Sequence, residues 1–484
     1  MDTSYYSHVD NLSSAKQLDV LILGGGPAGA SAGLNLLKRG DLSVMMVERG
    51  NYTEAKFGES LSSSVRSTLE YLGVWDAFTA TQDLAPFYSN VSWGSGVQRQ
   101  IGYMFTPNGG GWRLDRLALE RLLADSFVAR GGELWCDSQV VTCVRQAERG
   151  WQVEVKRDNQ ETQTIFCKYI IDASGRRGVM RTNLNLALTV HDRLIGVGCI
   201  GELSTSSPAK IANQMENPLE NQIVACEYGW WYISPMSNNQ VSVVLMSDPD
   251  IVNKLQACHP DVWRALLANV SNISESIQTA KFSEKPRSFP CYSSYLNAAG
   301  GKDWVAVGDA VAAYDPISSS GIPRALASGI HGAFIAVDSL FSNGELLSTY
   351  AQAIEQEFKQ YLQTQWQYYQ RETRWTESVF WARRRAVIGI SKESSVRATH
   401  VYEPRITRPP IHLKANEAYD LWLLCQVGKS LRQIIAEFSN HYVYLPESKI
   451  ILGLQELIES GFLEIFIEEE EDCVFFNTDR LYFN

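Results

Sequence analysis

The feature that most constrains this chain is a glycine-rich turn between an aliphatic run and a helical segment near the N-terminus. Residues 17–50 read QLDVLILGGGPAGASAGLNLLKRGDLSVMMVERG. Residues 19–23 have the composition of a buried parallel strand, residues 28–38 that of a helix, and residues 42–47 that of a second strand. This order of strand, turn, helix and strand predicts a βαβ unit of an α/β fold.

Three glycines, Gly24, Gly26 and Gly29, stand in GxGxxG spacing across that turn. The first permits a tight turn, the second lets the backbone approach a pyrophosphate, and the third lets the helix pack closely on the strand. The helix N-terminus offers N–H groups to phosphate. Glu48 follows Gly24 by 24 residues, close to the spacing of a carboxylate that binds ribose hydroxyls. The segment therefore predicts a dinucleotide site.

A second GxGxxG, at Gly196, Gly198 and Gly201, lies inside an alternating run with no helix after it. We interpret it as a strand that tolerates glycine, and not as a second nucleotide site. The protein is then expected to hold one dinucleotide, while its reductant binds transiently or comes from another protein.

The composition excludes several classes of protein. The chain has 484 residues, 45% hydrophobic and 20% charged, with a formal charge of -11. These values exclude wholesale disorder and argue against a nucleic-acid binder or an anionic-membrane binder. Nine scattered cysteines without CxxC spacing indicate reduced thiols in a cytoplasmic protein and no metal site. We see neither a signal peptide nor an apolar run long enough to span a membrane.

Three later segments narrow the choice of dinucleotide. Residues 112–124 read WRLDRLALERLLA, residues 167–178 read CKYIIDASGRRG, and residues 303–329 read DWVAVGDAVAAYDPISSSGIPRALASG. With the opening βαβ unit, they resemble the FAD-containing p-hydroxybenzoate-hydroxylase-like superfamily, which includes aromatic hydroxylases, flavin-dependent halogenases and geranylgeranyl reductases. The resemblance implies a glutathione-reductase-type Rossmann domain with an inserted antiparallel sheet that forms the substrate domain.

The same resemblance implies FAD as the cofactor and assigns roles to residues. Arg113 would approach the phosphate and ribose, Asp309 would bond ribitol or ribose, and Pro316 would lie over the isoalloxazine. The backbone of residues 320–322, at a helix N-terminus, would face the flavin pyrimidine edge. The complete expected FAD set is Gly24, Gly26, Pro27, Ala28, Gly29, Glu48, Arg49, Arg113, Asp172, Gly308, Asp309, Pro316, Ser320, Gly321 and Ile322.

Two segments point to the halogenase-like branch. Residues 57–75 resemble its GE segment, and GWWYISPM at 229–236 resembles its Trp-rich strand, although Tyr232 replaces the second tryptophan. Halogenases also need a lysine that relays hypohalous acid, and FYSNVSWGSG at 87–96 contains none. The combination is more similar to flavoprotein maturases that build tryptophan-derived quinone cofactors in partner proteins.

This branch implies a monooxygenase that uses O2 and a flavin C4a-hydroperoxide to hydroxylate an aromatic side chain, tryptophan, of a protein or peptide. Electrons would come from NAD(P)H or an external flavin reductase. Trp93, Trp230, Trp231 and Tyr232 could wall the substrate pocket, or they could be ordinary core aromatics. Glu59 could be a base or a helix-capping carboxylate. Pro316 and Ser318 complete the expected catalytic set.

The sequence is also compatible with other functions. An atypical halogenase would depend on chloride or bromide, and an isoprenoid reductase would need no O2. In a non-enzymatic alternative, FAD would be structural and the C-terminal part would be an adaptor.

The chain divides into parts by composition. We expect a flexible N-terminus at residues 1–16 and an FAD-binding monooxygenase-like core at residues 17–398. Within the core, residues 17–86, 112–180 and 290–345 would bind FAD, residues 87–111 and 181–289 would form the substrate sheet, and residues 346–398 a helical cover.

A polar linker at 399–412 precedes residues 413–484, which resemble a small winged-helix α+β domain of the peptide-clasping type. The acidic run at 468–472 disfavours DNA and favours a protein or peptide partner. A structural appendage is the alternative.

Overall fold

The fold is described from a computed structural model. The described residues are 16–54, 56–58, 60–81, 88–95, 99–102, 112–146, 150–157, 161–203, 221–236, 239–271, 273, 275–282, 285–385, 395–399, 413–459 and 462–466. They form two compact units, of which the first contains residues up to 358 and 372–380, and the second contains residues 359–371 and those from 381 onward. Within the described part, no helix is long and apolar enough to cross a membrane.

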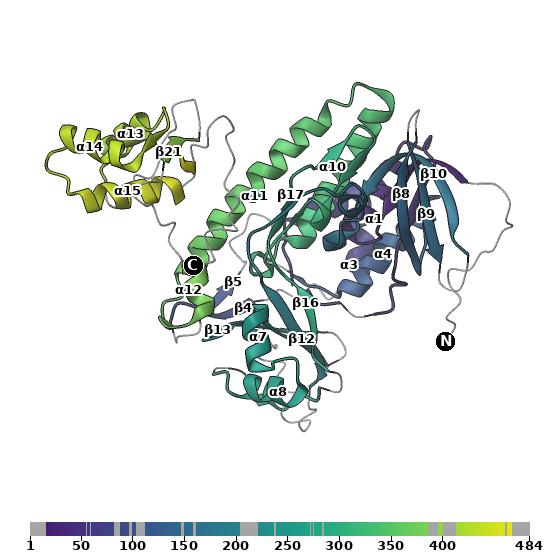
Figure 1. The fold of residues 1–484 in the computed structure, drawn as a ribbon. Helices are drawn as coiled ribbons and strands as arrows, with labels where there is room; N and C mark the ends of the chain where they lie inside the picture. The colour runs from purple at the N-terminus through teal and green to yellow at the C-terminus, as the bar shows by residue number, and fades with distance from the viewer. Residues whose placement is uncertain are drawn as a thin grey trace. The chain divides into compact units, whose positions relative to one another are not determined.

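The first sheet of the first unit is mainly parallel and carries the opening βαβ unit (Figure 1). Its strands run in the order β18-β19-β10-β1-β2-β7, with β9 paired to β10 and β8 paired to β9. Their bounds are β1 (Lys16–Leu23), β2 (Val44–Val47), β7 (Glu133–Trp135), β8 (Ser138–Arg145), β9 (Trp151–Arg157), β10 (Gln163–Asp172), β18 (Gly300–Gly301) and β19 (Trp304–Ala306).

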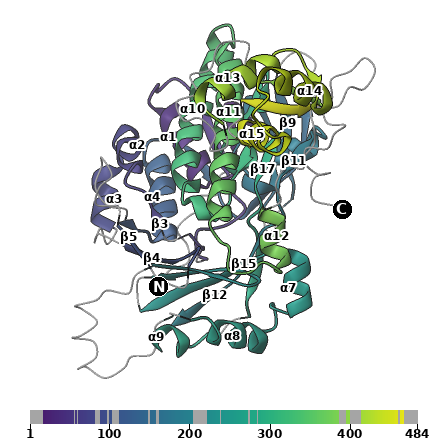
Figure 2. The ribbon, with the colours of Figure 1, turned by 90° about the vertical axis from the view of Figure 1, so that its left-hand side faces the viewer.

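Two helices that are far apart in the sequence lie side by side against this sheet: α1 (Pro27–Leu37) and α10 (Gly321–Phe341) (Figures 1 and 2). The Ser31 hydroxyl of α1 donates to the Leu326 carbonyl of α10 at 2.9 Å. A Cβ at Gly329 would lie 2.1 Å from the Ala28 carbonyl oxygen, so only glycine allows this close approach. Helices α2 (Val65–Leu72) and α4 (Arg116–Ala129) pack on α1, α3 (Trp75–Thr81) packs on α2 and α4, and α5 (Val179–Asn183) contacts β8.

The second sheet runs in the order β16-β12-β15-β14-β13-β4-β5. Its pairs are antiparallel except β13 with β4, which is parallel, so the sheet is mixed and not wholly antiparallel as expected. Its strands are β4 (Tyr88–Ser92), β5 (Arg99–Gly102), β12 (Ile195–Glu202), β13 (Asn221–Cys226), β14 (Gly229–Pro235), β15 (Gln240–Ser247) and β16 (Arg287–Pro290).

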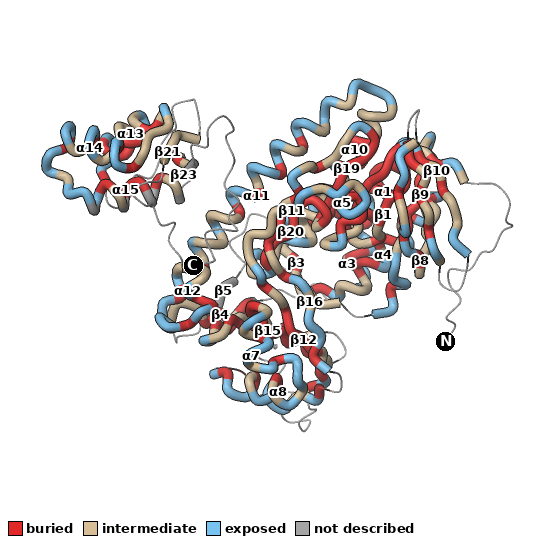
Figure 3. The backbone as a smooth tube through the Cα atoms, viewed as in Figure 1, coloured by how far each residue is buried: buried red, intermediate tan, exposed pale blue. Residues whose placement is uncertain are grey.

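One face of the second sheet forms a core under the helices α7 (Pro249–Leu255), α8 (Pro260–Ala268) and α9 (Glu275–Gln278) (Figure 2). Successive strand residues point to opposite faces. Trp231 and Leu245 are opposite each other in neighbouring strands, so their side chains lie on the same face of the sheet. Both are fully buried on the face that the helices cover, where Trp231 packs on Trp263. Many of the buried residues lie in the strands of the two large sheets (Figure 3). The other face of the second sheet is available to form the site.

The second GxGxxG lies in β12, as the sequence predicts, and the structure shows why glycine stands there. A Cβ at Gly196 would lie 2.6 Å from the Phe289 ring, and one at Gly198 would lie 3.0 Å from the Phe57 ring. The two aromatic rings stack on each other with centroids 4.8 Å apart. These glycines make room for aromatic side chains and not for a nucleotide.

Small strands complete the first unit: β11 (Leu188–Val190), β17 (Ser294–Leu296) and β20 (Ala312–Ala313) form one sheet, and β3 (Ser60–Leu61) pairs with β6 (Trp112–Arg113). The helical cover expected at 346–398 is interrupted. Helix α11 (Leu346–Gln370) runs from the first unit into the second, and α12 (Val379–Arg385) begins only after a break.

The second unit has its own apolar core. Its elements are α13 (Ala415–Leu424), α14 (Leu431–His441), α15 (Glu447–Glu459), β21 (Ser395–Ala398), β22 (Lys429–Ser430) and β23 (Leu463–Phe466). Strand β21 lies between β22 and β23, and Val396 is fully buried in the core. The unit therefore includes residues that precede the linker expected at 399–412, most of which lies outside the described residues.

Candidate functional site

The first part of the site is the turn after β1. Gly24 has φ +109°, and a Cβ there would lie 2.4 Å from the Ala173 carbonyl oxygen. A Cβ on Gly29 would lie 1.9 Å from the Gly24 carbonyl oxygen, so this glycine lets α1 sit directly on the turn. A Cβ on Gly26 would meet nothing within 4 Å. The turn therefore leaves open space in front of the N-terminus of α1, where a pyrophosphate can approach the backbone.

The carboxylate of Glu48 lies beside this turn, at the end of β2. Its Oε2 accepts a hydrogen bond from the Gly25 N–H at 2.6 Å, and its Oε1 accepts one from the Gly50 N–H at 2.7 Å. These bonds fix the direction of the carboxylate. Each carboxylate oxygen can accept a second hydrogen bond, so Glu48 can still bind hydroxyl groups.

A cavity of about 740 Å³ extends from the glycine turn to the second sheet. Leu23 of β1 is in register with Val47 of β2 and Asp172 of β10, so the carboxyl ends of these parallel strands meet at one edge. Ligands of open α/β sheets bind at such an edge. The cavity is lined at this end by Gly24, Gly26, Pro27, Ala28, Glu48, Arg49, Ser174, Arg176 and Asp309.

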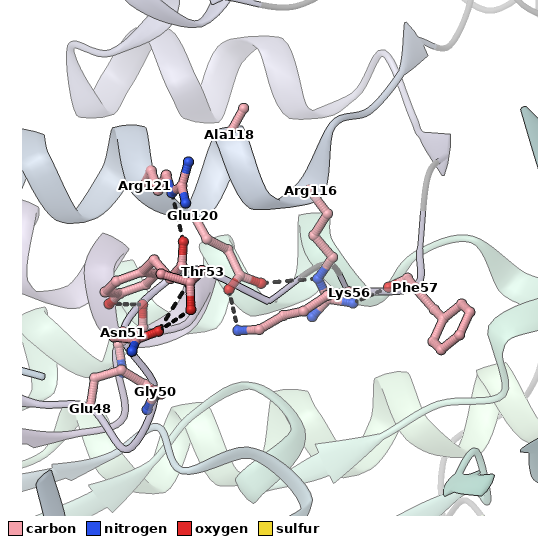
Figure 4. Close-up of polar contacts among 12 residues, drawn as sticks. Glu48, Gly50, Asn51, Thr53, Lys56, Phe57, Arg116, Ala118, Glu120 and Arg121 are labelled. Atoms are coloured by element: carbon pink, nitrogen blue, oxygen red, sulfur yellow. Dashed lines mark hydrogen bonds and ion pairs between the residues drawn. The ribbon is translucent and has the colours of Figure 1, made fainter. Parts of the chain in front are cut away.

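A buried carboxylate holds two cations on one side of the cavity (Figure 4). Glu120 of α4, whose side chain is 1% exposed, pairs with Lys56 at 2.5 Å and with Arg116 at 2.9 Å. Arg116 also donates to the Phe57 carbonyl oxygen at 2.7 Å, which ties the 56–58 loop to α4. Lys56, Arg116 and Glu120 line the cavity, and Arg113 does not. The positive charge at this position comes from Arg116 and Lys56.

The loop before α10 lines the cavity opposite the first sheet's edge. Pro316, Ser319, Ser320, Gly321 and Ile322 are among its lining residues. Helix α10 begins at Gly321, so its N-terminal N–H groups and positive dipole end are directed to the cavity.

Two further contacts fix this loop. The Asp315 carboxylate accepts from the Ile317 N–H at 2.8 Å. The Nε of Arg176 lies 3.4 Å from the carboxylate of Asp309, which couples the 174–177 turn to the segment after β19.

The arrangement fits FAD. The open cradle at Gly26 can take a pyrophosphate, Glu48 a ribose, and the α10 N-terminus an electron-rich ring edge. The model of the FAD binding domain family matches residues 17–353. The chain belongs to this family of FAD-binding proteins. Its cofactor is FAD, and it is an FAD-dependent oxidoreductase.

Known relatives of this flavoprotein include oxidoreductases and halogenases. It is 31% identical over 379 residues to the FAD-dependent oxidoreductase LodB of Marinomonas mediterranea, over 78% of this chain and 99% of that protein. It is 26% identical to the flavin-dependent halogenase armH3 of Armillaria mellea, over 67% of this chain and 68% of the relative. The structure of the myxobacterial chondrochloren halogenase CndH superposes with a TM-score of 0.66 at 18% identity, covering 94% of this chain and 98% of CndH, which shows a common fold.

The aromatic residues expected in the substrate pocket of the flavoprotein are only partly brought to the cavity. Tyr232 of β14 lines it. Trp231 lies on the opposite face of the sheet, in the core. Trp230 is 1% exposed, packs edge-on against Trp93 with centroids 6.3 Å apart, and neither tryptophan lines the cavity. Glu59 lies outside the described residues. The substrate-side wall is formed instead by Phe57, Tyr232, Val244, Met246, Phe289 and Pro290.

Other residues that were expected to bind FAD lie behind the residues that line the cavity. Asp172 is buried and accepts hydrogen bonds from the Ser174 N–H at 3.0 Å and the Met180 N–H at 2.7 Å. Burial raises the pKa of this carboxyl group above its ordinary value. Gly308 has φ +60°, and a Cβ there would lie 2.9 Å from the Ala28 Cβ. Asp172, Gly308 and Gly29 therefore shape the cradle without lining it.

Ser318 lines a smaller pocket of about 150 Å³ next to the main cavity and not the main cavity itself. Its hydroxyl lies 2.7 Å from that of Ser320.

Four residues of the cavity lining were not expected there from the sequence: Lys56, Arg116, Glu120 and Arg176. The spacing of Arg116 and Glu120, four residues apart on a helix, was the available signal for the ion pair on α4.

Proposed function

We propose that this flavoprotein is a monooxygenase that hydroxylates the aromatic side chain of a tryptophan in a protein or peptide partner. The observation that carries the proposal is the continuity of the cavity, which joins the FAD cradle to an apolar and aromatic wall. An aromatic ring can pack on Phe57, Phe289 and Met246 there, away from water. Bound FAD supplies two-electron redox chemistry and, once reduced, activates O2.

Different residues of the chain would then bind the cofactor, position the flavin ring and exclude water. Glu48, Lys56 and Arg116 would bind and orient the cofactor through its ribose and phosphates. The loop at 316–322 would hold the flavin ring at the N-terminus of α10, where the helix dipole stabilises negative charge on the reduced ring. The apolar residues of the wall would exclude water from the reacting ring. The expected electron source is NAD(P)H or a separate flavin reductase.

The test is oxygen transfer by the full chain reconstituted with FAD. Protein that has been reduced with NADPH or a flavin reductase and mixed with O2 should add one oxygen atom to the tryptophan of a peptide probe, measured by mass. A chain that consumes O2 and releases only hydrogen peroxide, with every peptide unchanged, would reject the proposal.

Halogenation is the second candidate, because armH3 is similar over two thirds of this chain. The absence of lysine from residues 87–96 speaks against it. The same reaction with added bromide separates the two: a brominated probe would establish halogenation, and an oxygenated probe in the presence of bromide would favour hydroxylation.

We propose that the second unit binds the protein partner. Within its described part, β22 and β23 are the outer strands of the sheet, and outer strands can accept a further strand from a peptide. Deletion of residues 413–484 should abolish partner capture while oxygenation of a free tryptophan derivative persists. Retained capture would reject this role.

A further inference from the structure

The wall of the cavity formed by the second sheet has a polar end. The Tyr232 hydroxyl lies 2.6 Å from the Ser60 hydroxyl. The Asn221 amide donates to the Ser60 hydroxyl at 2.7 Å and to the Tyr232 hydroxyl at 3.2 Å. The Ser234 hydroxyl donates to the Asn221 Oδ1 at 2.9 Å. We refer to Ser60, Asn221, Tyr232 and Ser234 as the hydroxyl–amide cluster.

The cluster is built from buried groups with fixed directions. Asn221 is 1% exposed and Ser234 is fully buried. Burying such groups is unfavourable unless they are hydrogen-bonded, and here each one is. Because Ser234 donates to the oxygen of the Asn221 amide, the amide nitrogen is directed to Ser60 and Tyr232. The two hydroxyl groups at the cavity are therefore held in place before a ligand arrives.

Ser60 and Tyr232 line the cavity, and the residues beside them on the wall are apolar. Tyr232 is directly opposite Val244 in the sheet, so their side chains share the face that carries the cavity. A serine hydroxyl offers one donor and two acceptor positions. Whichever of the two hydroxyls donates to the other, the bonds from Asn221 and their mutual bond leave the Ser60–Tyr232 pair one acceptor and one donor position, so the pair can accept one N–H from a ligand.

We propose that the hydroxyl–amide cluster determines specificity by binding the N–H group of the indole ring, with the ring itself on the apolar wall. This inference rests on the proposed function and names the group by which its substrate is recognised. A ring of equal shape without an N–H would displace water from Ser60 and Tyr232 without replacing its hydrogen bonds. The site should therefore prefer indole over such a ring.

The experiment measures binding to the full chain with oxidised FAD, through the change in flavin absorbance. The probes are N-acetyltryptophanamide and the corresponding benzothienylalanine amide, in which sulfur replaces the N–H. The wild-type protein should bind the indole probe at least tenfold more tightly. Ser60→Ala and Tyr232→Phe should reduce this ratio to near one by weakening the indole probe alone.

Ser62→Ala is the matched control. Ser62 lies two residues from Ser60, and its hydroxyl oxygen accepts hydrogen bonds from Ser64. It lines the smaller pocket and not the main cavity. The Ser62→Ala variant should therefore keep the wild-type ratio of affinities for the two probes. Equal affinities for the two probes in the wild type, no binding of either, or equal weakening of both by Ser60→Ala would each overturn the assignment. Ser60→Ala removes only a hydroxyl group, so it still tests the assignment if the Tyr232→Phe protein fails to fold.

Oxygen transfer to the indole probe is scored separately, by mass after reduction in air. A preference for the indole probe without oxygen transfer would reject the proposed function and support the role of the cluster in binding. Oxygen transfer without any preference would support the proposed function and reject the role of the cluster.

Discussion

The Nε of Arg116 lies 2.9 Å from Oε1 of Glu120, one helical turn further along α4. The same buried carboxylate binds Lys56 through its other oxygen. Two cations that would repel each other are thus held together at the edge of the cavity. This arrangement predicts that Glu120, which is 1% exposed, controls FAD affinity through its neighbours.

Glu120→Gln should weaken FAD binding by roughly tenfold, because loss of a charge-assisted hydrogen bond costs about 1.5–3 kcal/mol and tenfold in affinity corresponds to about 1.4 kcal/mol. Quenching of flavin fluorescence on titration of the apoprotein measures the dissociation constant. Glu70→Gln is the control, since Glu70 forms an i,i+4 pair with Arg66 on α2 that is exposed and remote from the cavity lining. Equal effects of the two substitutions would contradict the prediction.

Gly26→Ala and Gly29→Ala should have opposite phenotypes. An alanine at position 26 has φ -70° and open space around its Cβ, so the apoprotein should keep its stability but bind FAD at least about tenfold more weakly. An alanine at position 29 would overlap the Gly24 carbonyl oxygen, so the apoprotein itself should lose stability. Thermal unfolding with and without FAD separates the two effects.

Glu372 should make the stability of the first unit depend on pH. It is fully buried and binds Arg374 at 2.6 Å and the Gly94 N–H at 2.8 Å. Burial alone would raise the pKa of its carboxyl group, but hydrogen bonds from Arg374 and Gly94 outweigh burial and lower that pKa below 4.5. A carboxyl group with a lowered pKa stabilises the fold above its unfolded pKa and loses that contribution as pH falls through its folded pKa.

Glu372→Gln should therefore cost about 2 kcal/mol of unfolding free energy at pH 7, and the cost should shrink below the ordinary glutamate pKa of 4.5. Urea unfolding at several pH values measures it. Glu377→Gln, at an exposed position five residues later, is the control and should be neutral. A cost that stays constant with pH would argue against the ion pair as its source.

Cys258 should react with iodoacetamide before the other described cysteines, because it is the exposed one among them. Burial raises the pKa of the Cys136 and Cys143 thiols to about 12, so little thiolate forms at neutral pH. Peptide mapping of briefly labelled native protein gives the order of reaction. Equal labelling of Cys258 and Cys143 would contradict the burial of Cys143.

Local sequence predicted the opening βαβ unit well. The βαβ unit needs only short-range information, since its strands, glycines and terminal acid follow one another in the chain, and α10 begins at Gly321 as predicted. Arg113 illustrates the limit of such reasoning. It lies on β6, whereas Asp115 caps α4 by accepting from the Ala118 N–H at 3.0 Å, so the first arginine of the helix is Arg116. The cavity lining therefore includes Arg116, which begins the helix, and not Arg113, which precedes it and whose expected role came from the family resemblance.

The substrate side was less predictable because its wall comes from distant segments. Phe57 and Phe289 meet across the glycines of β12, and no local pattern joins them. The run Trp230, Trp231 and Tyr232 was expected to act together, yet successive residues of a strand face opposite ways. Alternation alone shows that Trp231 cannot share a face with Tyr232, but which face bounds the cavity depends on the helices that cover the other one.

The alternation along β14 has a consequence for redesign. Its odd-numbered residues, Trp231 and Ile233, belong to the core, while its even-numbered residues, Tyr232 and Ser234, belong to the polar end of the wall. Residues of the cavity wall and residues of the core thus alternate along one short strand. Of the even-numbered residues, Tyr232 lines the cavity, whereas Trp230 and Ser234 are almost fully buried, so a mutant library that varies position 232 can explore new substrates while the scaffold stays intact.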